Sequence, residues 1–384
     1  MKVYLDNSAT TKVLDSVRDI MVKTMQEDYG NPSSMHLVGM YAENYVKEAK
    51  NIIASALKVD TKEIYFTSGG TESNNMTIIG SAMANKRAGM HIITSAIEHP
   101  SVSNTMKYLE EQGFEVTRIG VDSEGIINLD ELQNALREDT ILVSVMYVNN
   151  EIGSVQPISE ISKIIKNYNH SILFHVDAIQ AFGKLEIYPR RLGVDMMSVS
   201  GHKIHGPKGS GFVYIKDKTK IKPIIHGGGQ QNAMRSGTEN VPGIAGIGQA
   251  VADVYSNLRE NSDKMMKMKN YFIDEITKLE GVSVNSGKDE KFAPHIISVS
   301  VDGVRSEVLL HALEEKGIYI SAGSACSSNK PAVSETLKAI GLPKNLLDST
   351  VRFSLSSFTT KEELDYAIEA MKEMLAKLRI YIRK

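Results

Sequence analysis

The sequence predicts an α/β fold: a large domain with a mostly parallel, seven-stranded type of sheet covered by helices on both faces, and a smaller α+β domain. Three observations support this. Short β-rich apolar runs alternate with longer helical patterns, as in chains of strand–helix–strand units. Several runs are apolar without alternation, which is typical of strands buried on both faces. A chain of 384 residues is also long enough for two packed domains.

The large domain is expected over residues 13–255. Its candidate strands are residues 63–67, 91–95, 141–145, 172–176, 196–200 and 211–215. Between them, apolar residues recur at helical spacing, from Leu37 through Tyr41 and Tyr45 to Ala49, and again at Leu129 and Leu132. This alternation places helices between consecutive strands.

The smaller domain is expected to combine residues 1–12 with residues 256–384, because the pattern changes after about Ala252. A long amphipathic helix runs from Leu258 and ends before Gly281. Strands at 296–301 and 318–321 flank a helix near 306–316, and Thr360 and Glu363 have capping-box spacing at the start of the last helix.

Composition and the N-terminal sequence argue against several classes of protein. A formal net charge of −2 gives no reason to expect direct binding of nucleic acid or of an anionic membrane. No apolar run approaches the ~20 residues that span a bilayer, and the N-terminus lacks a signal-peptide core. Cys326 is the single cysteine, so an intrachain disulfide and a cysteine-rich metal site are excluded, and a reducing, cytoplasmic location is expected.

Two polar residues follow candidate strands at what should be the same edge of the sheet. Lys203 comes after a run that ends at Ser200, and open α/β sheets bind ligands at such strand ends. A desolvated lysine there can form a Schiff base with an aldehyde, although most lysines after strands are only solvated. Asp177 ends another apolar run, where it could pair with a pyridine nitrogen or simply cap a helix.

Two further segments suit a phosphate and a flat ring. Gly69, Gly70 and Thr71 follow a strand and open a helix, so backbone N–H groups could approach a single phosphate; the alternative is an ordinary glycine-rich turn. No nucleotide-binding loop signature occurs. His99 follows a strand, where it could stack on a ring or transfer protons, or serve a purely structural role.

Together these features resemble the NifS/IscS-type cysteine desulfurases, a class V aminotransferase group of fold-type-I pyridoxal-phosphate enzymes. The resemblance runs nearly from end to end. Its further landmarks are Tyr4-Leu5-Asp6-Asn7-Ser8-Ala9-Thr10-Thr11, Tyr29-Gly30-Asn31-Pro32, Asn149-Asn150-Glu151-Ile152-Gly153, His226-Gly227-Gly228-Gly229, Arg235-Ser236-Gly237-Thr238, Ser324-Ala325-Cys326 and Val351-Arg352-Phe353-Ser354.

The resemblance implies pyridoxal phosphate as cofactor and a role for each matching residue. Lys203 would hold the cofactor, while His99 would stack on its ring and move protons. Asp177 would pair with the ring nitrogen and Gln180 with the ring hydroxyl. The remaining contacts would come from Gly70, Thr71, Ser200 and His202 to the phosphate, from Thr238 to the phosphate of the partner subunit in a homodimer, and from Asn150 and Arg352 to the substrate carboxylate.

Cys326 would be the second catalytic residue, carried on a mobile loop at about residues 321–334. The resemblance implies that L-cysteine becomes L-alanine while the sulfur stays on Cys326 as a persulfide. An acceptor protein, either an iron–sulfur scaffold or a thiolation enzyme, would then take the sulfur. No primary metal site is expected, although Cys326 is a candidate transient ligand of a nascent iron–sulfur cluster.

Two other functions are compatible with the same fold. Another class V enzyme, an aminotransferase or a selenocysteine lyase, would need Lys203, Asp177 and His99 but would not need Cys326. A non-catalytic scaffold on the same fold would need none of them.

Three departures from the family pattern are Ala322 in place of serine, His205 in place of tyrosine, and a chain end soon after the last helix, which puts docking of an iron–sulfur scaffold in doubt.

Overall fold

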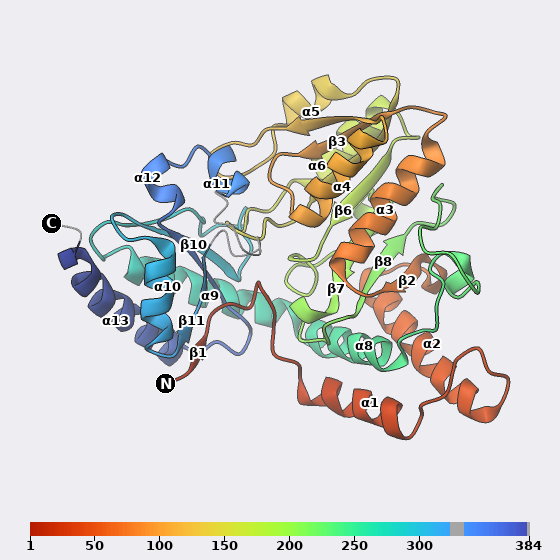
Figure 1. The fold of residues 1–384 in the computed structure, drawn as a ribbon, viewed down its shortest axis with the longest axis horizontal. Helices are drawn as coiled ribbons and strands as arrows, with labels where there is room; N and C mark the ends of the chain where they lie inside the picture. Colours follow the sequence, from red (N-terminus) through yellow and green to blue (C-terminus); the bar gives the residue numbers. More distant parts are fainter. Residues whose placement is uncertain (323–333, 382–384) are drawn as a thin grey trace.

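The large sheet confirms the predicted α/β architecture. The computed structural model describes residues 1–322 and 334–381. Within these residues the strands of this sheet run in the order β2-β8-β7-β6-β5-β3-β4 (Figure 1). Their bounds are β2 Ile64–Thr67, β3 His91–Ser95, β4 Glu115–Ile119, β5 Thr140–Met146, β6 Leu173–Asp177, β7 Met196–Ser200 and β8 Gly211–Ile215. The pairs from β4 to β7 are parallel, and β8 pairs antiparallel with both β7 and β2.

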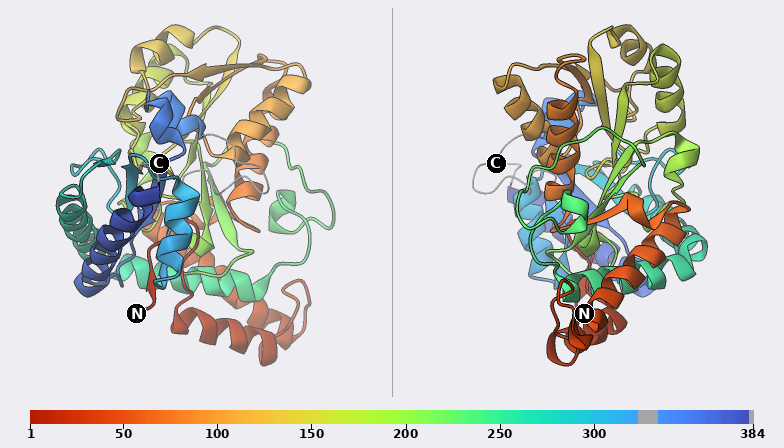
Figure 2. Two further views of the ribbon diagram at one scale, coloured as in Figure 1. Left: turned by 60° about the vertical axis from the view of Figure 1, so that its left-hand side comes forward. Right: turned by 90° about the vertical axis from the view of Figure 1, so that its right-hand side faces the viewer.

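Helices cover both faces of this sheet because its strands carry apolar residues on both sides. One core joins the sheet to α2 (Leu37–Leu57), α6 (Ile158–Tyr168) and α8 (Val241–Ser256). A second core joins the other face to α3 (Gly70–Asn85) and α4 (Pro100–Glu111). Figure 2 shows α3 and α4, in orange, on one side of the strands and α6 on the other. The remaining helices of this part are α1 (Asp15–Gln26), α5 (Leu129–Ala135) and α7 (Pro189–Leu192).

A second, antiparallel sheet has a hydrophobic core of its own. Its strand order is β12-β13-β10-β9, with β9 at Val282–Val284, β10 at Ile296–Val301, β12 at Ser321–Ala322 and β13 at Thr350–Ser354. The helices around it are α9 (Leu258–Ile276), α10 (Ser306–Glu314), α11 (Glu335–Ala339), α12 (Lys344–Leu347) and α13 (Lys361–Leu378). The capping box predicted for α13 is confirmed, since Thr360 and Glu363 bond each other's backbone.

The N-terminal segment belongs to this second part of the molecule. Strand β1 (Val3–Tyr4) pairs in parallel with β11 (Ile318–Tyr319), and Asp6 bridges to Ser354 in β13. Figure 1 shows β1 beside β11 and α10, near the C-terminal helix α13. The single strand predicted at 318–321 is wrong: the run splits, because β11 pairs with β1 while β12 pairs with β13.

Candidate active site

A cavity of about 200 Å³ opens at the carboxyl ends of β5, β6 and β7. It brings together nine of the predicted residues: Gly70, Thr71, His99, Asn150, Asp177, Gln180, Ser200, His202 and Lys203. A larger cavity of about 440 Å³, lined by Tyr4, His205 and Phe358 among others, contains none of them. The convergence of polar residues from separate strands, rather than volume, therefore identifies the candidate active site.

Lys203 lies at the end of a short 3-10 turn (Gly201–Lys203) directly after β7. Its Nζ donates to the backbone oxygens of Ser8 at 2.5 Å and Ala9 at 2.8 Å, so the N-terminal segment crosses close to the lysine. The buried Lys184 amine donates to the backbone oxygen of Lys203 at 3.2 Å. Burial and the Lys203 charge lower the pKa of Lys184 to about 8, well below that of an exposed lysine.

Asp177, the last residue of β6, is buried and held by two donors. The Ile179 N–H donates to Oδ1 at 3.0 Å and Asn74 Nδ2 donates to Oδ2 at 2.7 Å. Burial raises the pKa of the Asp177 carboxyl, while these donors and the charges of His99 and Lys203 oppose the rise. A cationic group in the cavity would stabilise the ionised carboxylate further. Asp177 caps no helix, which excludes the alternative considered for it.

His99 has a structural contact as well as a place on the cavity wall. It is the N-cap of α4, where Nδ1 accepts the Ser101 N–H at 3.1 Å and lies 2.8 Å from Ser101 Oγ. Burial lowers the pKa of His99, the charge of Lys203 adds to this effect, and the charge of Asp177 opposes it. The ring is therefore mostly neutral near pH 7.

The start of α3 forms a cradle of backbone N–H groups next to Ser200 and His202. Gly69 has φ +146°, a conformation that other residues rarely adopt, and the helix begins at Gly70. A Cβ on Gly70 would lie 2.2 Å from Ile179 Cδ1, so a larger residue here would displace the Ile179 side chain, which also lines the cavity. Burial, with the charges of Lys203 and Lys208, lowers the pKa of His202 to about 4. The positive end of a helix and neutral donors suit a bound phosphate.

Arg352 reaches this region from β13 and is only 5% exposed. Its Nη1 donates to the backbone oxygen of Asn150 at 2.7 Å, and its Nη2 pairs with Asp6 Oδ1 at 3.1 Å. Arg352 Nε is buried and has no hydrogen-bond partner among the described residues. The guanidinium is thus fixed at two points, which use two of its five N–H donors.

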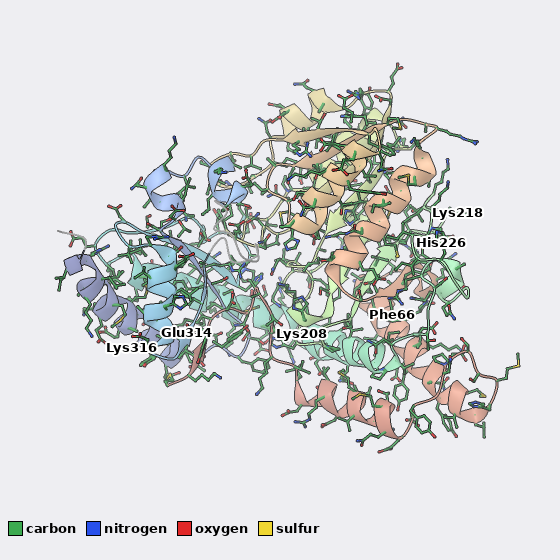
Figure 3. The ribbon with its side chains drawn as sticks, viewed as in Figure 1. Phe66, Lys208, Lys218, His226, Glu314 and Lys316 are labelled. Atoms are coloured by element: carbon green, nitrogen blue, oxygen red, sulfur yellow. The ribbon has the colours of Figure 1, made fainter. Side chains whose placement is uncertain are left out.

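Of the predicted residues that remain, Thr238 does not line this cavity. Thr238 is exposed, in the segment between β8 and α8. Figure 3 shows Lys218 and His226 of that segment at the margin of the molecule, away from Glu314 and Lys316 beside α10. Cys326 and most of the predicted loop at 321–334 lie outside the described residues.

Sequence reasoning missed several residues that support the site. Asn74 and Ser101 contact Asp177 and His99, and Asp6 pairs with Arg352. His295, which is buried, lies with its Nε2 3.3 Å from Gln180 Oε1. Asn74 occurs beside the predicted glycine turn, but nothing in the spacing showed that it would face Asp177.

Comparison with known proteins agrees with this geometry. The family described as aminotransferase class-V matches residues 3–367. The chain belongs to the class V aminotransferase family. Within this family, a curated relative named cysteine desulfurase IscS, from Methanosarcina thermophila, is 44% identical over 98% of this chain and 93% of its own length. A NifS/IcsS protein homolog of Lactobacillus delbrueckii subsp. bulgaricus is also 44% identical, over 97% of both chains.

Solved structures of the family share the fold as well. One, of a NifS-like protein, superposes with a TM-score of 0.93 and 39% identity, covering 98% of this chain and all of the other. Another, of SspA in complex with cysteine, has a TM-score of 0.80 and 34% identity over 94% of this chain and all of the other. The predicted family and fold are therefore confirmed.

Proposed function

We propose that this chain is a pyridoxal-phosphate-dependent cysteine desulfurase that converts L-cysteine to L-alanine and retains the sulfur on Cys326. The convergence of Lys203, Asp177 and His99 on one cavity at the strand ends carries the proposal. The names of the curated relatives support it, as does the solved structure of SspA in complex with cysteine.

The residues present fit the cofactor. Asp177 offers a buried carboxylate to a protonated ring nitrogen, and the glycine cradle at the start of α3 offers N–H groups to a phosphate. Lys203 would hold the cofactor covalently through Nζ. Gly70, Thr71, Ser200 and His202 would hold the phosphate, Gln180 the ring hydroxyl, and His99 the face of the ring. When bound, pyridoxal phosphate supplies an electron-withdrawing ring that stabilises negative charge on the substrate carbon.

The protein's own groups orient the substrate and handle protons. Arg352, fixed by Asn150 and Asp6, would bind the substrate carboxylate with its remaining N–H donors. His99 would hold a proton on the ring nitrogen that faces the cavity. The Cys326 thiolate would attack the substrate sulfur, forming an S–S bond as the C–S bond breaks. The departing electron pair takes up a proton, so alanine leaves and a persulfide remains.

We also propose a homodimer. Large apolar side chains are exposed around the start of α2, with Tyr29 at 72%, Met35 at 101% and Leu37 at 64%. A patch of this kind usually marks a protein contact, and a second copy of the chain is the occupant we infer. Thr238, exposed on an outer segment, would then contribute to the partner's phosphate site.

The division into domains and the cellular setting remain part of the proposal. One core under each sheet supports a large domain at 13–255 and a smaller one formed by 1–12 and 256–384, with Ala293 and Ile296 of the smaller one packing into the core of the large one. Every helix in residues 1–322 and 334–381 is too short or too polar to cross a membrane. We expect a cytoplasmic enzyme whose sulfur acceptor serves iron–sulfur cluster assembly or thiolation of transfer RNA or a cofactor.

The Cys326→Ala variant tests the function. The parent should form alanine and sulfide from cysteine, and the variant should lose sulfur transfer while keeping the cofactor absorbance of the parent. A variant that still releases sulfide at the parent's rate would instead favour a class V enzyme that works without Cys326. A colourless protein that cannot be loaded with cofactor would refute enzymatic function altogether.

A further inference from the structure

One buried amide connects the two cavity residues Asp177 and His99. Asn74, on α3, is fully buried, and its Nδ2 donates to Asp177 Oδ2 at 2.7 Å and to Ser101 Oγ at 2.9 Å. Its Oδ1 is buried without a hydrogen-bond partner in the described part of the chain. A carboxylate accepts hydrogen bonds and cannot donate them, so the amide nitrogen must face Asp177. Both amide hydrogens are then used, and Asn74 forms a hydrogen-bonded bridge between Asp177 and Ser101.

The direction of the bridge determines the proton position on His99. Because Ser101 Oγ accepts from Asn74, its own hydrogen is free to point at His99 Nδ1, 2.8 Å away. The Ser101 backbone N–H also donates to Nδ1, at 3.1 Å. A ring nitrogen that accepts hydrogen bonds carries no hydrogen, so the neutral ring has its proton on Nε2.

We propose that Asn74 and Ser101 are positioning residues that join His99 to Asp177 and fix the His99 proton on Nε2, the nitrogen left to contact whatever occupies the cavity. This inference rests on the proposed function only in that His99 is taken to face the cofactor. Protonation of Nδ1 would require the Ser101 hydroxyl to turn away, and it would point the Nδ1–H of His99 at the backbone N–H of Ser101. Burial and the Lys203 charge also favour the neutral ring because they lower the pKa of His99, while the Asp177 charge raises it.

Titration of His99 by nuclear magnetic resonance tests the bridge without relying on turnover. The protein is labelled with ¹³C,¹⁵N-histidine, loaded with its cofactor, and the His99 signals are identified by their loss in His99→Asn. In the parent, the ring should show an unprotonated Nδ1. Ser101→Ala removes one donor to Nδ1 and should raise the pKa of His99 by about 0.5–1 pH unit, the effect of one hydrogen bond of ordinary strength.

Two variants separate positioning from simple packing. Ser101→Thr keeps the hydroxyl and should keep the parent titration. Asn74→Ala frees the Ser101 hydroxyl to reorient and should shift the titration in the same direction as Ser101→Ala. A parent ring protonated on Nδ1 would overturn the proposal. So would Ser101→Ala and Asn74→Ala proteins that melt at a lower temperature yet titrate like the parent. If the parent formed no alanine from cysteine, the proposed function would fail while the tautomer measurement stood.

Discussion

Replacement of Arg352 by lysine tests the proposed substrate-carboxylate site. The guanidinium uses Nη1 on Asn150 and Nη2 on Asp6, and its Nε is the buried donor without a partner among described residues. Lysine places its hydrogens on a single nitrogen, so it cannot keep both anchors and still reach a ligand. We expect at least one charge-assisted hydrogen bond to the substrate to be lost.

The loss of one such bond is worth roughly 1.5–3 kcal/mol, which corresponds to a rise in KM for cysteine of roughly 10- to 150-fold. The value of kcat should change much less, as for a group that binds the substrate and the transition state alike. Alanine formation is measured over a range of cysteine concentrations, and cofactor absorbance and melting temperature show whether the variant is folded and loaded.

The matched control is Arg305→Lys. Arg305 lies directly before α10, its side chain is 71% exposed, and it pairs with Glu307. The KM of this variant should equal that of the parent. A folded, loaded Arg352→Lys protein with an unchanged KM would refute the assignment of Arg352 to the substrate carboxylate.

Three further predictions concern the cofactor site and stability. Gly70→Ala places a Cβ 2.2 Å from Ile179 Cδ1, so the Ile179 side chain must shift in the cavity wall, and cofactor binding should weaken roughly 10-fold in titrations of the cofactor-free protein. Burial lowers the pKa of Lys269 from 10.5 to about 7, so the folded state resists its protonation. Lys269→Met should therefore raise the melting temperature more at pH 6 than at pH 10, by roughly 1 °C per kcal/mol of relieved penalty for a chain of this length. Thr360→Ala removes the N-cap of α13 and should cost about 1 kcal/mol in urea unfolding.

Each of these has a control on the same chain. Gly120→Ala lies in a loop away from the cavity, where the added Cβ meets only the end of the Glu131 side chain, and should bind cofactor like the parent. Lys267→Met changes an exposed lysine of α9 and should show no pH-dependent gain, whereas Thr360→Ser keeps the capping oxygen. Equal gains for Lys269→Met at both pH values, parent-like affinity for Gly70→Ala, or an unchanged urea midpoint for Thr360→Ala would each contradict the reasoning.

The strands at the centre of the fold were predictable because burial on both faces demands unbroken apolar runs. His91–Ser95, Met196–Ser200 and Gly211–Ile215 form strands with the predicted bounds. The edge strand Glu115–Ile119 was not predicted, since its residues are mostly solvent-facing and it lacks an apolar run. The split between β11 and β12 was missed because pairing with two different partners is decided by tertiary structure.

The cavity was predicted better than the residues that support it. Strand ends at one sheet edge and the family resemblance together brought Asp177 and Lys203 to the same place. The bridge through Asn74 and Ser101 depends on how α3 packs against α4, and helical spacing within each segment carries no information about that contact. The pairing of Asp6 with Arg352 joins residues 346 positions apart, beyond the reach of any local pattern.

The pairing of β1 with β11 has a consequence for synthesis on the ribosome. The first strand emerges early, but its partner, Ile318–Tyr319, is translated more than 300 residues later. At about 5–20 residues per second, the N-terminus must wait on the order of 15–60 s before it can dock. Throughout that interval Leu5, fully buried in the finished protein, stays exposed to chaperones and proteases.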